Sequence, residues 1–488
     1  MPLDPRTPVL VGAAAAQQRE EDPARAREPL ALMALALDLA AEDAGSRLLL
    51  ERADSIRVPR GTWPYSDAGR LLADRVGAHA ARTVLANLGV LQTTLLGGAA
   101  RDIAAGRADV VLVAGGEATH RDRRARELGS EAPFTAQHDA QPDEVLNPRG
   151  ELLGVAELRA RLLSPVSQYA LIENALRAAQ GLSLEEHRRQ VAELWSALSS
   201  AARDNPDAWE REPLTADAIR EPGPGNRMLA FPYCKKHLSQ MKVDQAAGLI
   251  LCSVETARSL GTPRERWVFP WAVAESNHMV PLTERRALHR SPGFAEAGRR
   301  ALEHARLTAD DVGHLELYSC FPCAVRIQLR ELGIDPARRL SVSGGMAVAG
   351  GPLNNFVLQS QVCMTRVLRA EPGSVGMVTA VSGLMTKQGL GLWSTEPGPR
   401  PFVFDDVSES VARQVETVPV AETAAGEATI VSYTVLHDAP EPRTVVLADL
   451  DRGGRAVVSD PDPRLAALAS EQELCGRRVR VSESLELL

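Results

Sequence analysis

Two cysteines separated by two residues, Cys320 and Cys323, follow closely after a tyrosine, Tyr318. A Cys-x-x-Cys spacing suits a redox pair or one half of a zinc site, but no second pair of ligands stands at a matching distance, so no metal site is predicted. Their expected place at the start of a helix favours a thiolate at one of them. The alternative interpretation is that both cysteines pack in the core.

Tyr318 and a histidine, His278, each follow a segment with the pattern of a buried strand. A tyrosine hydroxyl at a strand end could donate a hydrogen bond to an enolate or act as an acid or base. The alternative is a buried tyrosine whose hydroxyl bonds elsewhere in the protein. For His278 a structural role competes with a catalytic one in the same way.

The elements that must position these side chains form two similar series. In the first, strands are expected at 9–15, 55–58 and 110–116, with helices at 28–44 and 95–105. In the second, strands are expected at 268–274, 315–318 and 375–381, with helices at 292–305 and 357–369. The first and last strands are separated by nearly the same interval in both series. A duplicated α/β unit is the simplest interpretation.

Two further regions complete the chain. Residues 120–240 are polar and rich in helical patterns, and long insertions in compact folds are usually lids or binding loops. A Pro- and Gly-rich stretch at 396–401 is followed by short alternating strands, which predict a small β-barrel of the OB kind. The expected domains are 1–119 with 241–262, the insert 120–240, a second half 263–400, and a β-domain 401–488.

Three segments carry a resemblance to a known family. The duplicated architecture, the segment 101–116 and the glycine-rich loop 343–355 are similar to the thiolase superfamily. The segment 316–322 and the C-terminal β-domain resemble its thiolase-like acetyl-CoA acetyltransferase branch. The resemblance implies an α/β protein with a duplicated thiolase fold and acyl-CoA or coenzyme A as substrate or ligand. It also implies that no cofactor is tightly bound and that a homodimer could form through the thiolase core.

The four positions that carry thiolase chemistry are changed in this chain. By family spacing the nucleophilic cysteine falls at Gly89, and 89–94 contains no cysteine; Thr93 or Thr94 could instead cap the following helix. Tyr318 takes the place of the asparagine that holds the oxyanion-hole water, and Gly351 takes the place of the activating histidine. Turnover through a covalent acyl-cysteine is therefore not expected.

The second cysteine of the family, an acid/base, falls by spacing at Val381–Ser382. The candidate catalytic residues that remain are Tyr318, Cys320, Cys323 and His278. Through the resemblance, the candidate residues for binding coenzyme A or its thioester are Gln92, Thr93, Gly344, Gly345, Gly350, Gly351, Pro352, Lys235 and Lys236. Glycines also serve tight turns, and adjacent lysines are often only solvated.

Composition narrows the class of protein. The 488 residues carry a formal net charge of −8 and only 4% aromatic residues, which argues against nucleic-acid binding. Six cysteines are too few for a disulfide framework. The N-terminus does not have the pattern of a signal peptide, and the apolar run 30–41 is too short to cross a bilayer. A soluble, cytoplasmic protein is expected.

Three functions stay open on the sequence. The resemblance favours a thiolase-like acyltransferase of lipid metabolism, or an acyl-CoA-binding relative of one. A lyase that cleaves a β-hydroxyacyl-CoA by a retro-aldol reaction needs the oxyanion hole but no cysteine. A non-catalytic scaffold that binds coenzyme A is the third. The sequence specifies neither the acyl chain nor the oligomeric state.

Overall fold

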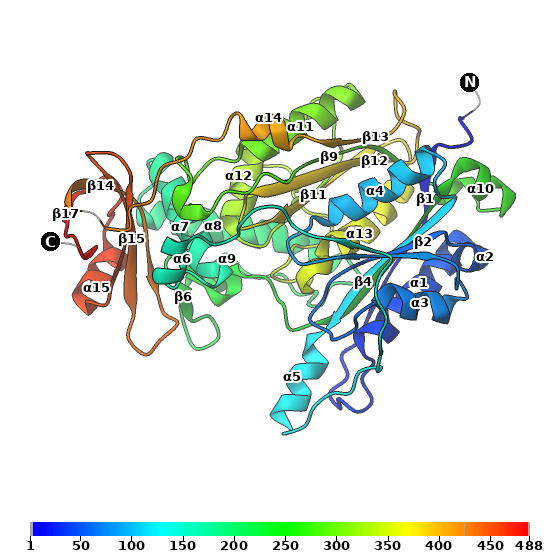
Figure 1. The fold of residues 1–488 in the computed structure, drawn as a ribbon, viewed down its shortest axis with the longest axis horizontal. Coiled ribbons are helices and arrows are strands. Elements are labelled where there is room, and N and C mark those ends of the chain that lie inside the picture. The colour runs from blue at the N-terminus through cyan, green and yellow to red at the C-terminus, as the bar shows by residue number, and fades with distance from the viewer. Residues whose placement is uncertain (1–2, 424, 487–488) are drawn as a thin grey trace.

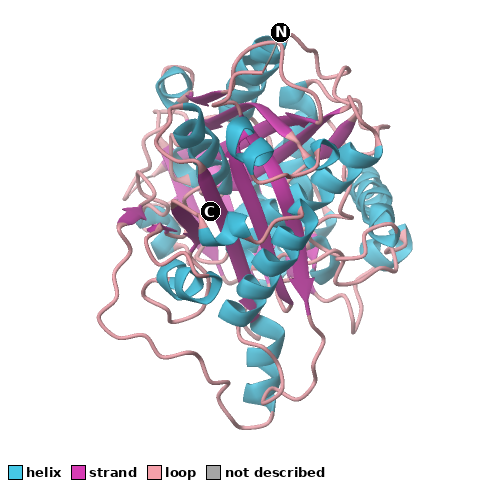
Figure 2. Ribbon diagram, turned by 90° about the vertical axis from the view of Figure 1, so that its right-hand side faces the viewer, coloured by secondary structure: helices cyan, strands magenta, loops and turns pink. Residues whose placement is uncertain are grey.

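The computed structural model describes residues 3–423 and 425–486. Two mixed β-sheets form the body of the molecule, and a third sheet stands at one end, beyond the helices of the insert (Figure 1). Figure 2 shows the strands in the interior of the molecule, with helices both among them and on the outside. In the described residues no helix is long and apolar enough to cross a membrane.

The first sheet has the strand order β1-β8-β4-β2-β3-β5. Its central strands β4 and β8 are buried along their whole length, which explains their continuous apolar sequence. Its strands are β1 (Pro8–Gln17), β2 (Ser55–Pro59), β3 (Arg82–Ala86), β4 (Val110–Ala118), β5 (Glu144–Leu146) and β8 (Asp244–Ser253).

The second sheet has the order β10-β11-β12-β9-β13. Its strands are β9 (Phe269–Ser276), β10 (His314–Glu316), β11 (Val375–Ser382), β12 (Lys387–Ser394) and β13 (Val403–Asp406). The last of these follows the Pro- and Gly-rich stretch and pairs with β9, so the chain returns to the second sheet before it enters the C-terminal sheet.

The two halves repeat one strand arrangement. In β2-β4-β8-β1 the first pair is parallel and the next two are antiparallel. In β10-β11-β12-β9 the same three relations occur in the same order. The duplication that the sequence predicts is therefore present in the sheet topology.

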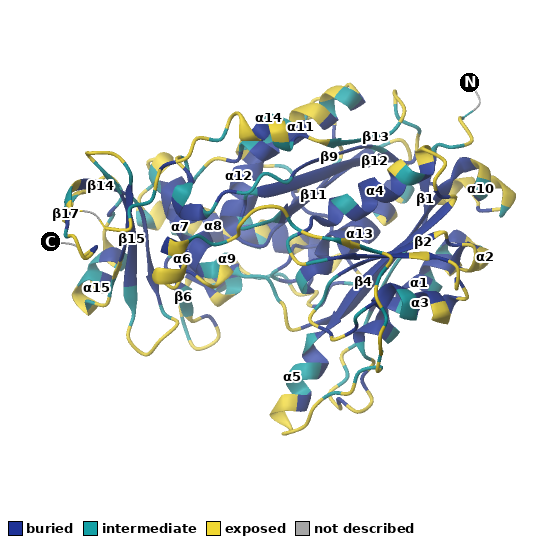
Figure 3. Cartoon of the chain, viewed as in Figure 1, coloured by how far each residue is buried: buried dark blue, intermediate teal, exposed yellow. Residues whose placement is uncertain are grey.

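Two buried helices lie between the sheets. Both α4 (Gln92–Ala104) and α13 (Phe356–Ala370) contact strands of each sheet, and Figure 3 shows them among the most buried elements. Small residues make this packing close: a Cβ atom at Gly97 would lie 2.7 Å from the ring of Phe404. Outside the sheets, α1 (Pro29–Ala44) covers the first and α11 (Pro292–Ala305) the second.

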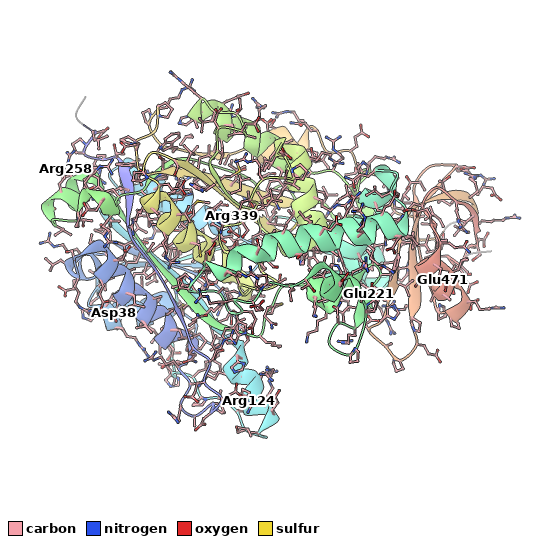
Figure 4. The ribbon with its side chains drawn as sticks, turned by 180° about the vertical axis from the view of Figure 1, so that it is seen from behind. Asp38, Arg124, Glu221, Arg258, Arg339 and Glu471 are labelled. Atoms are coloured by element: carbon pink, nitrogen blue, oxygen red, sulfur yellow. The ribbon has the colours of Figure 1, made fainter. Side chains whose placement is uncertain are left out.

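The remaining helices of the body are short or lie at the edges. They are α2 (Leu48–Glu51), α3 (Ala68–Val76), α5 (Thr119–Glu127), α10 (Val254–Ser259), α12 (Pro322–Leu332) and α14 (Ser408–Ala412). The insert adds α6 (Val155–Arg159), α7 (Pro165–Ala179), α8 (Leu184–Ser199) and α9 (Ala216–Arg220), and α15 (Pro463–Glu471) belongs to the C-terminal sheet. Figure 4 shows from behind how the insert runs between the body and this sheet.

The C-terminal sheet differs from the closed OB-like barrel that the sequence predicts. Its order is β16-β15-β14-β6-β7, with β17 also on β14, and no pairing among the described strands closes it. Because β17 and β6 occupy the two ends of one edge of the long β14, they do not join to β16. Its strands are β6 (Met228–Ala230), β7 (Tyr233–Cys234), β14 (Gly426–Leu436), β15 (Arg443–Leu450), β16 (Arg455–Asp460) and β17 (Arg478–Val481). Two of these strands come from the insert.

Candidate functional site

A pocket of about 470 Å³ lies where the two halves meet the insert. Its walls are the start of α4, the start of α7, the segment after β10, the glycine-rich loop and the end of β11. Most of the lining side chains are apolar, and none of the described lining residues carries a carboxylate, an amine, a guanidinium or an imidazole.

Gln92, the first residue of α4, lies in this pocket and is 4% exposed. Its Nε2 donates to the backbone oxygen of Asn354 at 3.2 Å and to the Asn354 side chain. Its Oε1 is buried and has no hydrogen-bond partner in the described structure. Buried polar atoms are rarely left without a partner, so this oxygen is available to a ligand.

Thr93 lies outside the pocket, and the capping role predicted for Thr93 or Thr94 is wrong. The N-cap position is Leu91 and makes no side-chain cap. The two hydroxyls instead donate to the carboxylate of Glu275, each at 2.8 Å. They point toward the second sheet because Glu275 of β9 lies directly beside the first turn of α4.

Glu275 and Lys387 form hydrogen bonds that hold the start of α4 in place. Neither residue was predicted from the sequence. Lys387 is fully buried and its Nζ donates to the backbone oxygen of Gly89 at 3.0 Å. Burial raises the pKa of Glu275, and burial lowers the pKa of Lys387 although the charge of Glu275 opposes this. The only trace of this pair in the sequence is one charged residue in each of two apolar strands: Glu275 near the end of β9 and Lys387 at the start of β12.

Tyr318 lies in the pocket with its hydroxyl free of any hydrogen bond to the described residues. Its backbone is fixed, because its N–H donates to Thr379 Oγ1 at 2.7 Å and its oxygen accepts from Gln328 at 3.0 Å. Its ring packs edge-on against Phe356 at 5.8 Å. Burial raises the pKa of Tyr318 far above its ordinary value, so its hydroxyl stays protonated and can donate.

Only one of the two cysteines reaches the pocket. Cys320 lines it, whereas Cys323 is fully buried on α12 with its Sγ directed at the backbone oxygen of Tyr169, 3.6 Å away. Burial raises the pKa of Cys320 to about 12, although a hydrogen bond with Tyr169 acts in the opposite direction. Burial also raises the pKa of Cys323 well above its ordinary value. The thiolate that the helix start suggested is therefore not favoured, because desolvation outweighs the helix dipole.

Tyr169 is a pocket residue that sequence reasoning missed. It comes from α7 of the insert, and its ring stacks on Phe321 with centroids 4.2 Å apart. Ser164 and Val166, at the start of the same helix, line the pocket as well. The Ser-Pro start of this helix was visible in the sequence, but the face that it turns to the body was not.

The glycine-rich loop contributes less to the pocket than the resemblance implied. Gly351 lines the pocket, and a Cβ atom there would lie 3.0 Å from Ser239 and 3.2 Å from Met346. These side chains therefore leave little space for a side chain at position 351. Leu353 and Asn354, a little further along, also line it.

The other glycines of the loop let the protein approach itself rather than a ligand. Gly344 lies against the backbone of Ala202, Gly345 against Leu198, and Gly350 against Gln245. Each has a positive φ and a neighbour that leaves no space for a side chain. Pro352 is outside the pocket lining as well.

Glu316 holds the start of this loop in place. The fully buried carboxylate accepts hydrogen bonds from the hydroxyls of Ser341 and Ser343 and from the backbone N–H groups of Val342 and Ser343, at 2.8 to 3.1 Å. Burial raises the pKa of Glu316 to about 7, and these donors act in the opposite direction. The loop is thus fixed from the side that faces away from the pocket.

The turn between β11 and β12 forms the last wall. Val381, Ser382 and Leu384 line the pocket. Three successive residues, 383–385, have φ between 53° and 71°, and two of them are Leu384 and Met385. Such strained backbone outside glycine is concentrated at functional sites.

His278, Lys235 and Lys236 are not brought to this pocket. His278 lines a separate cavity beside the start of α11. Lys235 is exposed and Lys236 half-buried in a short 3₁₀ turn after β7, and neither lines the pocket. Among the described residues, no group of three His, Cys, Asp or Glu side chains is placed to hold a metal ion.

The electrostatics of the pocket come from backbone rather than from charged side chains. The helices α4, α7 and α12 all begin at the pocket, at Gln92, Pro165 and Pro322. Helix N-termini carry partial positive charge, so three of them favour a negatively polarised oxygen at this place. An apolar cavity with such an end suits a thioester: the acyl chain against the apolar wall and the carbonyl oxygen near the helix starts.

Similarity to known proteins is found both in the sequence and in the fold. No protein-family model matches the chain. The curated "Acetyl-CoA acetyltransferase" of Methanothermobacter thermautotrophicus is 25% identical over 221 residues, covering 40% of this chain. The match spans 55% of that enzyme's length.

Solved structures give likenesses over most of the chain. A monomeric SCP2-thiolase like protein type 1 (STLP1) from Mycobacterium smegmatis superposes with a TM-score of 0.85 and 29% identity, covering 99% of this chain and 98% of that one. The dimeric peroxisomal thiolase of Saccharomyces cerevisiae superposes over 81% of this chain and 99% of its own, with a TM-score of 0.58 and 16% identity. An Ltp2-ChsH2(DUF35) aldolase covers the same shares with a TM-score of 0.60 and 19% identity. The chain therefore has a thiolase-like fold, and along almost its whole length it is similar to an SCP2-thiolase-like protein.

Proposed function

We propose that the protein binds an acyl-CoA thioester, with the acyl chain in the pocket and the thioester carbonyl at the start of α4. The observation that carries this proposal is the pocket itself, which is apolar and uncharged except for the partial charges of the helix starts. The likeness to an acetyl-CoA acetyltransferase and to SCP2-thiolase-like proteins supports an acyl-CoA as the ligand.

Two hydrogen-bonding groups would orient the thioester. The Tyr318 hydroxyl is protonated, free and inside the pocket, so it can donate to the carbonyl oxygen or to the enolate formed from it. The unpartnered Oε1 of Gln92 can accept a hydrogen bond from an amide or hydroxyl of the ligand. Neither group needs to be ionised.

The chemistry would proceed without a covalent acyl-enzyme. By the resemblance, Gly89 falls at the family's nucleophile position and Gly351 at that of its base, and the space next to Gly351 is taken by Ser239 and Met346. An acyltransferase of the usual thiolase kind needs both the nucleophile and its base. A relative of this protein is an acetyltransferase, but transfer of an acyl group is not proposed here. The activity proposed is binding of the thioester.

A tryptophan at the mouth of the pocket tests this proposal. Val166, half-buried in the first turn of α7, lines the pocket, so Val166→Trp is expected to fill it and weaken acyl-CoA binding at least tenfold. Val155→Trp is the matched control, because Val155 is 71% exposed on α6 and lies away from the pocket. Titration calorimetry with butanoyl-CoA measures both. Equal affinity of the two variants would place the ligand elsewhere.

A retro-aldol lyase acting on a β-hydroxyacyl-CoA is the second candidate, favoured by the free hydroxyl of Tyr318. In this reaction the β-hydroxyl loses its proton, the Cα–Cβ bond breaks, and the β-carbon leaves as a carbonyl compound. The electron pair stays on the thioester as an enolate, which takes up a proton at Cα. Because Tyr318 is protonated and none of the described lining residues is a base, the two proton transfers must be coupled: Tyr318 gives its proton to Cα while the proton of the β-hydroxyl passes to the Tyr318 oxygen.

The lyase makes a specific prediction for Tyr318→Phe. Loss of one acid/base group is expected to lower the cleavage rate by about 100-fold or more while binding is nearly unchanged. Tyr433→Phe is the control, since Tyr433 is a buried tyrosine of β14 outside the pocket. The readout is release of the carbonyl product from a β-hydroxyacyl-CoA. An unimpaired Tyr318→Phe variant would assign Tyr318 to packing, and binding without any turnover would favour the non-catalytic scaffold.

One feature of the first sheet argues against the homodimer that the resemblance implies. The short strand β5 pairs with β3 and so covers the outer edge of the first sheet at residues 84–86. The SCP2-thiolase-like protein of similar fold is monomeric. We infer that this chain also works as a monomer.

A further inference from the structure

A second cavity, of about 410 Å³, lies beneath the start of α11. Its walls are the segment 285–291, the turn between β11 and β12, and the chain just after α14. Helices α11 and α14 lie side by side in Figure 1. It shares no lining residue with the acyl pocket. The turn separates the two: Leu384 faces the acyl pocket and Met385 faces this cavity.

Arg285, which lines this cavity, is a buried cation with no carboxylate partner. It is 8% exposed; its Nε donates to the backbone oxygen of Val280 at 3.0 Å and its Nη1 to that of Leu384 at 2.8 Å. No carboxylate of the described chain lies within ion-pair distance. Glu157, whose charge acts on Arg285 from further away, is occupied by Thr283 and Gly154.

This makes Arg285 an exception in the molecule. Every other buried arginine of the described chain forms an ion pair with an aspartate or glutamate: Arg57, Arg121, Arg177, Arg326 and Arg455. Burial lowers the pKa of Arg285 only to about 10, so the group stays charged at neutral pH. A buried charge without a counterion is costly, and an anion in the cavity would remove that cost.

Other features of the cavity suit an anion. Gln388 lines it at 2% exposure, with an Oε1 that has no partner in the described structure; since an amide oxygen only accepts, it suits the protonated oxygen of a phosphate monoester rather than a bare carboxylate oxygen. The fourteen-residue helix α11 begins at its wall, with partial positive charge at that end. Arg286 and Arg290 stand at its rim, already paired with Asp449 and Glu331, and the carboxylate among its lining residues is that of Glu416.

We propose that this cavity binds a small organic anion, a carboxylate or a phosphate monoester, which pairs with Arg285. The anion's oxygens take the guanidinium N–H groups that the two backbone carbonyls leave free. The volume suits a small molecule rather than a macromolecule. The anion can come from a free metabolite or from a phosphate of coenzyme A, and the experiment separates the two.

The test measures anion binding by the whole protein. Thermal unfolding and calorimetry are followed while sodium phosphate or sodium acetate replaces sodium chloride at constant ionic strength. Wild type is expected to show saturable stabilisation by at least one of the two anions over chloride. Arg285→Met is expected to weaken that binding at least tenfold, and Arg285→Lys to retain part of it.

Two further variants keep the result interpretable. Ala287→Trp fills the cavity from a half-buried position while it leaves Arg285 in place, and it is expected to remove the effect even if Arg285→Met folds poorly. Arg299→Met is the control, since Arg299 is a surface arginine of α11 paired with Glu296 and Glu303. No anion-specific stabilisation of wild type, or a wild-type response in both cavity variants, overturns the proposal.

Competition between coenzyme A and phosphate shows whether the bound anion is a free molecule or part of coenzyme A. If saturating coenzyme A leaves phosphate binding unchanged, the site serves a free anion; if it displaces phosphate, a coenzyme A phosphate occupies the site. Val166→Trp, which blocks only the acyl pocket, is expected to bind phosphate as wild type does. If the acyl-CoA proposal is wrong, acyl-CoA binding fails while phosphate binding remains. If the anion proposal is wrong, phosphate binding fails while acyl-CoA binding remains.

Discussion

Incubation with acetyl-CoA or acetoacetyl-CoA is expected to leave no acetyl group on this protein. Thiolytic turnover should stay at the background rate, because by the resemblance to thiolases Gly89 and Gly351 fall at the positions of the nucleophile and its base. Removing a general base alone typically costs 10²–10⁴-fold, and here the nucleophile is absent too. Intact-protein mass spectrometry measures this directly, since one acetylated nucleophile adds about 42 Da.

Cys320 is the residue that could overturn this expectation, because its thiol lines the pocket. An adduct that maps to Cys320 would show a relocated nucleophile, and the lyase would lose its main support. Burial raises the pKa of this thiol to about 12, so little thiolate is present at neutral pH. Alkylation of all six cysteines after unfolding is the control that the thiols are intact.

Arg326→Met is expected to lower the free energy of unfolding by about 3–5 kcal/mol. Arg326 of α12 forms an ion pair with Glu173 of α7, and Glu173 is fully buried. Glu173 also accepts from Tyr233 at 2.5 Å and contacts His187 at 2.9 Å. Burial would raise the pKa of Glu173, but the charge of Arg326 and the bond with His187 hold it at about 2. Removing Arg326 leaves an uncompensated charge inside the protein.

Arg330→Met is the matched control for this substitution. Arg330 lies one turn further along α12, is exposed, and pairs with Glu331 at 2.8 Å. Glu331 also pairs with Arg290 at 2.8 Å, so its carboxylate stays paired in this variant, and the loss should be at most about 1 kcal/mol. Urea denaturation measures both variants. Equal losses would show that the buried cluster does not fasten the insert to the body.

The fold could be predicted from the sequence to a large extent because buried strands and helices leave strong patterns. The apolar strands β4 and β11 and the helices α1 and α11 lie where the patterns place them. The part that β6 and β7 take in the C-terminal sheet could not be predicted, because these strands are only three and two residues long. They join β14 some two hundred residues away through contacts that leave no periodic signal.

Four of the residues proposed from motifs in the sequence line the pocket: Tyr318, Cys320, Gly351 and Gln92. Their roles stay predictions. Cys323 and Cys320 share a motif, yet α12 begins between them and carries Cys323 into the core. A glycine looks the same in sequence whether a ligand or the protein's own chain approaches it, which is why Gly344 was assigned to a ligand. Tyr169 was missed because only the packing of α7 brings it to the pocket.

Affinity for acyl-CoA thioesters of increasing length tests most directly whether the pocket between α4 and α7 holds the acyl chain. Each methylene buried there should contribute about 0.8 kcal/mol, or roughly fourfold in affinity. Calorimetry with coenzyme A, acetyl-CoA, butanoyl-CoA and hexanoyl-CoA gives the slope. The account predicts that affinity rises steadily from coenzyme A to hexanoyl-CoA. Affinity that does not depend on chain length, or no saturable binding of any thioester at millimolar concentration, would contradict it.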